Sequence, residues 1–172
     1  MIIGVYGYSN SGKTYLIRRL TQKLRSLGYI VSTIKYIMHE DGVFTIDTAG
    51  KDTWYHADAG AQMVVAKLLN ETVFIVKHSM DIETITRIIQ EISRPDIILA
   101  ESCKDVDIPK IAVGDIEEVE NTIFKYSGYQ SQSGSQSPEG DDAAAEDEDV
   151  EFERLVKYIR NLSRDSSNAK RI

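Results

Sequence analysis

Residues 7–14 read GYSNSGKT, which matches the pattern GxxxxGK[ST] of a phosphate-binding loop. An apolar run at 1–6, MIIGVY, precedes the loop and is typical of a buried strand. Gly28 lies where a helix end favours a residue that tolerates positive φ. Between the loop and Gly28, apolar side chains recur at helical spacing, at Leu16, Ile17, Leu20, Leu24 and Leu27. We therefore predict a strand, a glycine loop and a helix in direct succession.

The chemistry of triphosphate binding explains the residue types in this loop. Glycines let the backbone curl until successive N–H groups point at phosphate oxygens, and the helix N-terminus adds the positive end of its dipole. Lys13 supplies a cation for the β- and γ-phosphates, and the hydroxyl of Thr14 is a hard oxygen ligand for Mg²⁺. We expect a nucleoside triphosphate to be held by Gly7, Asn10, Ser11, Gly12, Lys13, Thr14 and Tyr15.

Such a loop also requires an acid that follows a neighbouring strand and holds the water shell of the metal. Glu101 closes the apolar run at 96–100 and is the first candidate, because the carboxyl ends of parallel strands meet at one edge of a sheet. Asp96 lies at the opposite end of that run and is unsuited. Asp47, which follows VFTI, is the second candidate. We therefore predict a Mg²⁺ site made by Thr14, Asp47 and Glu101.

The rest of the chain alternates between strand and helix patterns. A helix is expected over 81–92, where isoleucines recur on one face. Further strands are expected at 29–34, 43–46, 62–66, 72–76, 96–100 and 109–113. Alternation of this kind favours an α/β fold, here a P-loop domain with a mainly parallel β-sheet flanked by helices and a short antiparallel element.

The C-terminal part has a different composition. Residues 127–149 are rich in Ser, Gln and Gly and then in Asp, Glu and Ala, so we expect an acidic, disordered linker after a nucleotide-binding domain at 1–126. Residues 150–172 restore a helical apolar stripe. Two interpretations of this helix stay open: it docks on the domain, or it binds a partner.

Charge, cysteine content and hydropathy restrict the class of protein. The formal net charge is −7, but nine acids fall within 139–153, which leaves 20 basic and 18 acidic residues elsewhere. No basic cluster indicates a nucleic-acid partner. The single cysteine, Cys103, permits no intramolecular disulfide, and we expect it to be a buried thiol. No apolar stretch approaches the ~18 residues of a membrane span, so we expect a cytoplasmic protein without membrane contact.

A second glycine-lysine pair lies at Gly50-Lys51, within DTAGKDT at 47–53. The first four residues match the DxxG switch of regulatory GTPases, but no guanine-reading [NT]KxD follows a later strand. In such proteins a glutamine that orients water usually follows the glycine. Lys51 stands there instead and cannot accept a proton, so no catalytic base is assigned and slow hydrolysis at most is expected.

The wider stretch GKDTWYHADAGA at 50–61, with the phosphate-binding loop, Thr33-Ile34-Lys35 and the Pro109-Lys110-Ile111 segment, resembles the MobB family of molybdenum cofactor biosynthesis. The resemblance covers about residues 2–115. It implies a P-loop fold, GTP and Mg²⁺ as ligands, weak hydrolysis and a homodimer. It also implies a helper role toward the guanylyltransferase that joins a guanylyl group to molybdopterin. We expect Gly50, Lys51 and Asp52 to face the γ-phosphate or the pterin phosphate, or Asp52 or Thr53 to cap a helix.

The chain departs from the family pattern in two places. Histidines commonly follow the lysine of the family's TIK segment, whereas only His39 remains in the stretch after Lys35. Glu101-Ser102-Cys103 stands where the family tends to have Glu-Gly-Phe. Two alternatives from other classes stay open: a small-molecule kinase or ATP-dependent ligase on the same fold, and an interaction protein whose terminal helix docks under nucleotide control.

Overall fold

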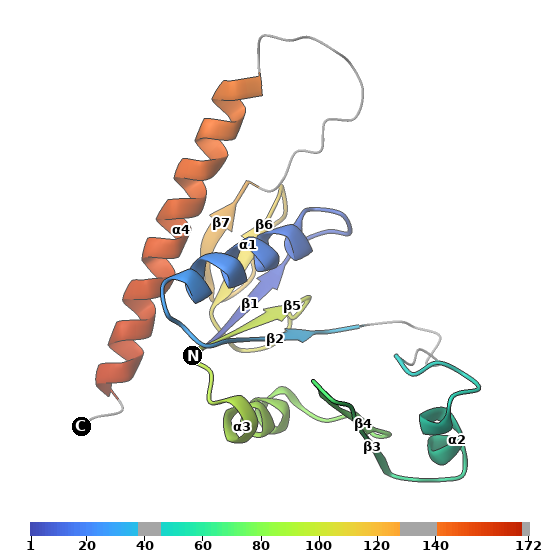
Figure 1. Cartoon of the computed structure of the whole chain (residues 1–172). Helices are drawn as coiled ribbons and strands as arrows, with labels where there is room; N and C mark the ends of the chain where they lie inside the picture. The colour runs from blue at the N-terminus through green and yellow to red at the C-terminus, as the bar shows by residue number, and fades with distance from the viewer. Residues whose placement is uncertain (38–45, 128–140, 170–172) are drawn as a thin grey trace. The chain divides into compact units, whose positions relative to one another are not determined.

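The computed structural model describes residues 1–37, 46–127 and 141–169 (Figure 1). Contacts divide the chain into two compact units, Met1–Ile37 with Ile89–Ile172, and Met38–Ile88. The elements are, in order, β1 (Ile2–Tyr6), α1 (Lys13–Ser26), β2 (Val31–Lys35), α2 (Asp52–Asp58), β3 (Met63–Lys67), β4 (Thr72–Val76), α3 (Ile82–Ser93), β5 (Ile97–Glu101), β6 (Lys110–Val113), β7 (Thr122–Tyr126) and α4 (Asp141–Ala169). The strand, glycine loop and helix predicted at the N-terminus are therefore confirmed.

The larger unit is built on a five-stranded sheet in the order β2-β5-β1-β6-β7. All of its strand pairs are parallel. Every residue of β5 is buried. An inner strand of a parallel sheet is covered on both faces, which explains the continuous apolar run of its sequence. Val5 of β1 and Lys35 of β2 both pair in register with Glu101 of β5, which sets their carboxyl ends at one edge of the sheet. The predicted mainly parallel sheet is confirmed.

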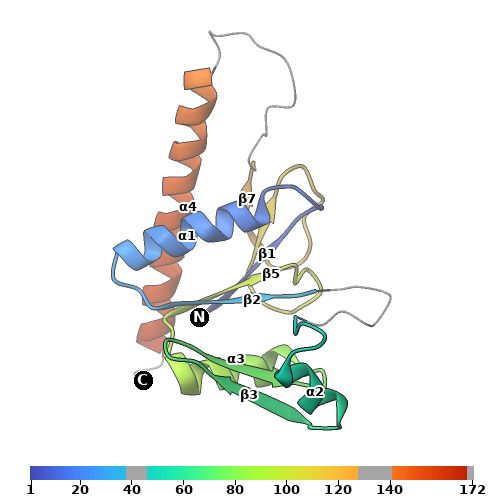
Figure 2. The same cartoon turned by 45° about the vertical axis from the view of Figure 1, so that its right-hand side comes forward.

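One face of this sheet packs against helices α1 and α4, which lie beside each other in both views (Figures 1 and 2). Alternate side chains of β1, β5 and β6 point toward these helices. The helices contribute their own apolar stripes, which share one core with the sheet. The members of this core are Ile3, Val5, Leu16, Ile17, Leu20, Leu24, Ile97, Leu99, Ile111, Val113, Tyr126, Phe152, Leu155, Val156 and Ile159.

Helix α4 is part of this domain rather than a detached tail. Ion pairs of 2.6 Å join Arg19 of α1 to Glu148 and Asp149 of α4. The Tyr126 hydroxyl also donates a hydrogen bond of 2.9 Å to Glu148. The interpretation that the helix docks on the domain is therefore confirmed.

The predicted boundary between linker and helix was wrong, because α4 begins at Asp141 and includes residues 141–149. Acidic residues in the N-terminal part of a helix are favoured by its dipole, which composition alone did not reveal. The remainder of the predicted linker, 128–140, lies outside the described residues.

The smaller unit contains the antiparallel hairpin β3–β4, in which Met63 pairs with Val76 and Lys67 with Thr72. This confirms the short antiparallel element of the predicted fold. Most of the expected strand at 43–46 lies outside the described residues, as does His39.

The other predicted elements at 29–34, 62–66, 72–76, 81–92, 96–100 and 109–113 correspond to β2, β3, β4, α3, β5 and β6. Strand β7 was not predicted. Its short stretch Thr122–Tyr126 lies at the edge of the sheet and mixes polar with apolar residues, so it carries no strong strand pattern.

Candidate functional site

The glycine loop runs from the end of β1 to the start of α1 and has the backbone that its sequence predicts. Gly12 is the N-cap of α1 and adopts a left-handed conformation with φ of 94°. At Gly7 an added Cβ would lie 2.5 Å from the carbonyl oxygen of Val113 and 2.6 Å from Ser11 Oγ. The loop thus passes so close to the end of β6 that only glycine fits at its first position.

The glycine loop brings together groups that can bind an anion. Ser11 Oγ is buried and has no hydrogen-bond partner within the described part of the chain. The first turn of α1 contains no acid of its own, and the carboxylate beside it is that of Glu101 from β5. Lys13 Nζ donates to the carbonyl oxygens of Gly7 at 3.0 Å and Tyr8 at 2.5 Å. A buried hydroxyl, a helix N-terminus and an ammonium group together fit a phosphate group.

The charge of Lys13 is disfavoured in the structure. Burial lowers the pKa of Lys13 from its ordinary value, and the positive charge of Lys35 adds to this effect while Glu101 opposes it. Two ammonium groups near each other are repulsive, and a bound polyanion would relieve that repulsion. An anion bound here would pair with the Lys13 ammonium group and so favour its charged form.

Glu101 is the acid that the structure brings to the loop. Thr14 Oγ1 donates a hydrogen bond to it, at 3.1 Å from Oε1 and 3.3 Å from Oε2. Lys35 Nζ forms an ion pair of 2.5 Å with Oε1. Glu101 is only 7% exposed, so its carboxylate is held close to the core. Hydroxyl and carboxylate oxygens are the ligands that Mg²⁺ prefers, so Thr14 and Glu101 fit a metal that accompanies a triphosphate.

Two other residues near this site, Tyr15 and Asn10, are exposed to solvent. The hydroxyl of Tyr15 accepts a hydrogen bond of 3.4 Å from Arg19, whose guanidinium lies 5.6 Å from the Tyr15 ring centroid. Asn10 adopts a left-handed backbone with φ of 61° within the loop. Both were predicted to contact nucleotide; the structure places them in the loop and the first turn of α1, and their contact remains a prediction.

Cys103 follows Glu101 and is buried, as predicted. Its Sγ donates a hydrogen bond of 3.0 Å to the carbonyl oxygen of Ala100. Burial raises the pKa of the Cys103 thiol above its ordinary value. The neutral thiol is therefore favoured, which argues for a packing role rather than a nucleophilic one.

The second glycine-lysine stretch lies in the smaller unit, and the structure defines its local geometry. Asp47 Oδ1 accepts hydrogen bonds from the Thr48 N–H at 3.0 Å and from Thr53 Oγ1 at 2.9 Å. Lys51 is the N-cap of α2 and forms no side-chain cap, so the expectation that Asp52 or Thr53 caps this helix was wrong. A threonine in the first turn donates to Asp47 instead.

Gly50, Lys51 and Asp52 remain predicted phosphate contacts, and Asp47 remains a predicted metal ligand. Gly50 has φ of 84°, which favours glycine, and no atom lies within 4 Å of a Cβ built there. Open space around Gly50 and the extended backbone of Lys51 leave this turn accessible.

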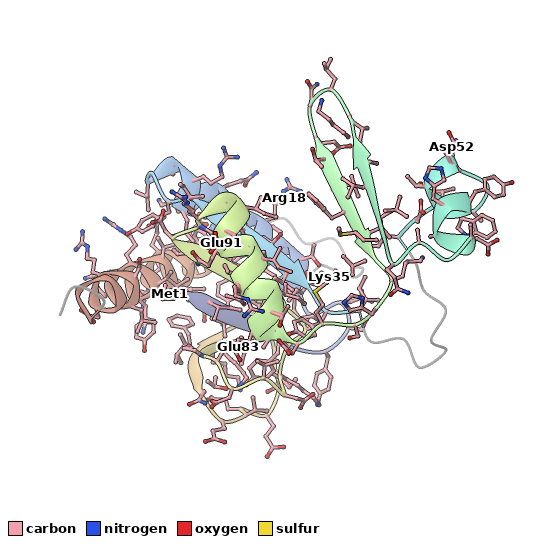
Figure 3. The ribbon with its side chains drawn as sticks, turned by 90° about the horizontal axis from the view of Figure 1, so that it is seen from below. Met1, Arg18, Lys35, Asp52, Glu83 and Glu91 are labelled. Carbon is pink, nitrogen blue, oxygen red and sulfur yellow. The ribbon has the colours of Figure 1, made fainter. Side chains whose placement is uncertain are left out.

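Sequence reasoning missed Lys35 as a site residue. It stands at the carboxyl end of β2 and is labelled in Figure 3. The pairing of β2 with β5 puts it opposite Glu101, and that register cannot be read from the sequence. The available signal was its position directly after the predicted strand at 29–34, at the same edge of the sheet as the glycine loop.

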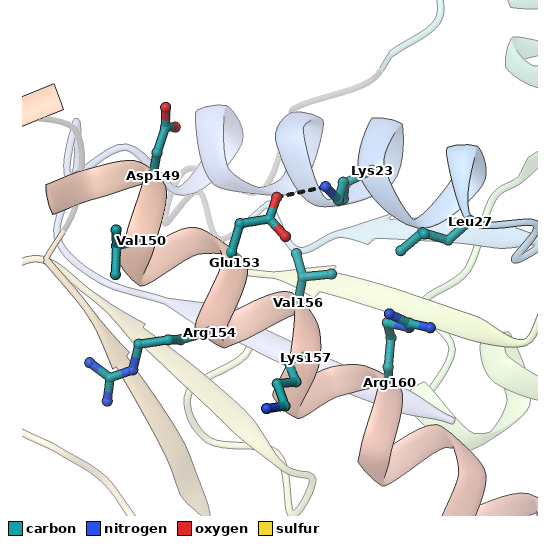
Figure 4. Close-up of a pocket in the computed structure, with 9 residues that line it drawn as sticks. All are labelled: Lys23, Leu27, Asp149, Val150, Glu153, Arg154, Val156, Lys157 and Arg160. Atoms are coloured by element: carbon teal, nitrogen blue, oxygen red, sulfur yellow. Dashed lines mark hydrogen bonds and ion pairs between the residues drawn. The ribbon is translucent and has the colours of Figure 1, made fainter. Parts of the chain in front are cut away.

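A separate groove lies between α1 and α4, with a volume of about 710 Å³ (Figure 4). Its apolar lining comes from Leu27, Val150 and Val156. Lys23 forms an ion pair of 2.6 Å with Glu153 across it. Neither the glycine loop nor Glu101 lines the groove, so it is distinct from the phosphate-binding site.

Among the described residues, no helix is long and apolar enough to cross a membrane. The architecture and the loop define the class of protein: a P-loop α/β protein, in which β1 leads through a glycine loop into α1 beside an acid that ends β5. A family model described as MobB, molybdopterin guanine dinucleotide synthesis protein B, matches residues 2–128. The chain therefore belongs to the MobB family.

Two relatives named as molybdopterin-guanine dinucleotide biosynthesis adapter proteins are identical to this chain at about a third of the aligned residues. It is 33% identical over 113 residues to the molybdopterin-guanine dinucleotide biosynthesis adapter protein of Haemophilus influenzae, a match that covers 64% of this chain and 61% of that protein. It is 32% identical over 115 residues to a putative adapter protein of the same description from Methanocaldococcus jannaschii, covering 65% and 46%. The matched part is thus less than two thirds of either relative.

The fold is also similar to that of solved structures. A crystal structure of Bacillus subtilis MobB aligns with a TM-score of 0.61 at 22% identity, over 88% of this chain and 96% of that chain. The similarity at this level of identity supports the fold and does not by itself carry over a ligand.

Proposed function

We propose that this protein binds GTP with Mg²⁺ and acts as an adapter in the formation of molybdopterin guanine dinucleotide. The observation that carries the proposal is the arrangement of Lys13, Thr14 and Glu101 at the end of the glycine loop, in a member of the MobB family. The name of the Haemophilus influenzae relative supports the adapter role.

The residues of the loop would divide the work of holding the nucleotide. The backbone N–H groups around Gly12 and the buried Ser11 hydroxyl would donate to phosphate oxygens, and Lys13 would exchange its carbonyl partners for phosphate. Thr14 and Glu101 would hold Mg²⁺, which bridges phosphate oxygens and neutralises their charge when bound. Asp47 is proposed as a further ligand to the water shell of the metal.

Slow hydrolysis is part of the proposal. Lys51 follows Gly50 in the DxxG-like stretch, and an ammonium group cannot orient a water by accepting its proton. A protein that holds GTP without consuming it suits an adapter, which serves a guanylyltransferase partner and the molybdopterin that the partner modifies. The role of Gly50, Lys51 and Asp52 would be to contact the terminal phosphate of GTP or of the pterin.

We also propose a homodimer, supported by the exposed apolar surface of the hairpin. Met63, Val65 and Phe74 of β3 and β4 are 55%, 48% and 54% exposed. Cross-strand pairing sets Val65 opposite Phe74 and Met63 opposite Val76, so these residues lie on the same face of the hairpin. An apolar face of this kind is typical of a surface that a second chain covers.

The alternative of an interaction protein that docks through its terminal helix is less well supported, because α4 buries its apolar face in the core of its own domain. The kinase or ligase alternative shares the loop chemistry. A kinase or ligase would consume the bound nucleotide when an acceptor is present, whereas the proposed adapter holds it.

Reconstitution with the guanylyltransferase of the same organism tests the adapter role. We expect the wild-type protein to increase the formation of molybdopterin guanine dinucleotide from molybdopterin and GTP, and Lys13→Ala to lose this effect. The matched control is Lys23→Ala, which removes a partly exposed lysine from the last turn of the same helix, away from the loop. An effect that is equal for wild type and Lys13→Ala would contradict the role of bound nucleotide.

A further inference from the structure

Lys35 and Thr14 bind the same carboxylate oxygen from two different elements. Lys35 Nζ lies 2.5 Å from Glu101 Oε1, and Thr14 Oγ1 donates to that same oxygen at 3.1 Å. The carboxylate is nearly buried, whereas the Lys35 side chain is 56% exposed. The ammonium group of Lys35 thus reaches the oxygen of the proposed metal ligand from the solvent side.

The charges around Glu101 do not balance without a further anion. Lys13 donates to main-chain carbonyl oxygens, so among the described residues the ion pair of Glu101 is with Lys35. A divalent cation placed on Glu101 and Thr14 would compete with the Lys35 ammonium for Oε1, because the two cations repel one another at such short range. A displaced Lys35 would then need a new anionic partner in the same place.

We propose that Lys35 is a second phosphate-binding lysine, which occupies Glu101 in the free protein and transfers to a phosphate of the nucleotide when Mg²⁺ takes its place. This inference rests on the proposed function, since it takes the Mg²⁺–nucleoside triphosphate complex as the ligand. It assigns to Lys35 an ammonium–phosphate contact that complements that of Lys13. It also makes the free site ready for nucleotide, because Lys35 keeps the buried carboxylate paired until the metal arrives.

A purely structural role for Lys35 makes a different prediction. If Lys35 only neutralises Glu101, its loss lowers stability and removes a competitor for Oε1, so the affinity for nucleotide in Mg²⁺ is unchanged or higher. If Lys35 binds phosphate once Mg²⁺ has taken its place on Glu101, its loss weakens nucleotide binding in Mg²⁺, since an ammonium–phosphate contact is missing.

The test measures the Kd of a fluorescent N-methylanthraniloyl GTP in EDTA and in Mg²⁺ for wild type, Lys35→Met and Lys35→Gln. Glutamine keeps a hydrogen-bond donor for Glu101 without the charge, so it guards against loss of folding in the methionine variant. Lys23→Met is the control, because it breaks an ion pair of 2.6 Å on α1 away from the loop. Thermal unfolding of each variant accompanies the titrations.

We expect both Lys35 variants to bind the nucleotide at least about tenfold more weakly than wild type in Mg²⁺. Lys23→Met should match wild type in both conditions. Affinities of the Lys35 variants in Mg²⁺ equal to or above that of wild type would overturn the inference and leave the proposed function standing. A wild-type protein that binds no nucleotide in either condition would instead overturn the proposed function.

Discussion

The hydroxyl of Thr14 in the first turn of α1 donates a hydrogen bond of 3.1 Å to the carboxylate of Glu101 at the end of β5. The two residues are 87 positions apart in the sequence. Parallel pairing of β1 with β5 brings them together, because the glycine loop continues from β1 directly into α1. This contact links the phosphate-binding loop to the acid proposed to hold Mg²⁺.

Replacing Glu101 by glutamine should remove the Mg²⁺ dependence of nucleotide binding. The amide keeps the size of the side chain and can still accept from Thr14, but it has no charge for a divalent cation. We expect the gain in GTP affinity on adding Mg²⁺ to fall at least about tenfold. Titration of GTP in EDTA and in Mg²⁺ measures the gain.

Asp96→Asn is the matched control for this variant. Asp96 Oδ2 accepts a hydrogen bond of 2.7 Å from the Ile30 N–H at the opposite end of the same strand. Its loss should alter stability and leave the gain with Mg²⁺ as in wild type. A Glu101→Gln protein with an unchanged gain would show that Glu101 does not hold the metal.

Gly7→Ala should abolish GTP binding, because a Cβ at this position would lie 2.5 Å from the Val113 carbonyl oxygen and force the loop to move. Gly28→Ala is the matched control. Gly28 also has positive φ, at 90°, but no atom lies within 4 Å of a Cβ built there. It should cost about 1 kcal/mol of stability from backbone strain and retain GTP binding. Equal binding by both variants would contradict the close approach of the loop to β6.

Leu155→Ala should destabilise the whole domain by about 2–5 kcal/mol, the usual range for a leucine removed from a packed core. Leu155 of α4 is fully buried with side chains of α1 and the sheet. Urea unfolding measures the loss, with exposed Lys157→Ala on the same helix as the control. Equal stability of the two variants would mean that α4 is dispensable to the core and is free to serve a partner.

Cys103 should react slowly with thiol reagents in the folded protein. Burial raises the pKa of the thiol, so less thiolate is present at pH 8 than in an exposed cysteine, and access is also restricted. We expect labelling by a chromogenic disulfide at pH 8 to be at least about tenfold slower in the folded protein than in urea. The folded rate should continue to rise with pH beyond the ordinary thiol pKa. Rapid labelling of the folded protein at pH 7 would indicate a reactive thiol instead.

Local patterns were sufficient to predict most of this fold. The loop GYSNSGKT at 7–14 fixed the order of strand, loop and helix, and continuous apolar runs predicted β1 and β5 because both are buried on two faces. Strand β7 escaped prediction because an edge strand of mixed polarity has no such run. The start of α4 was placed too late because Glu148 and Asp149 of this helix are held by Arg19 and Tyr126, contacts across the fold that local composition does not encode.

The candidate site shows the same division between local and long-range information. Lys13, Thr14 and Gly12 were predictable because one motif carries them, and Glu101 because a strand end carries it. Lys35 was missed as a site residue because its role depends on the β2–β5 register. Gly50 and Lys51 lie in the smaller unit, and their phosphate contact stays a prediction.

The most direct test of the central claim is equilibrium binding of GTP and of ATP, each with Mg²⁺, to wild type and to Lys13→Ala, followed by the release of phosphate. Lys13 supplies the ammonium group of the loop, so its loss removes charge-assisted contacts to phosphate. We predict a preference for GTP, almost no phosphate release, and an affinity at least about tenfold weaker in the variant. Equal GTP affinity in Lys13→Ala, or a preference for ATP with turnover that depends on an acceptor, would contradict the account.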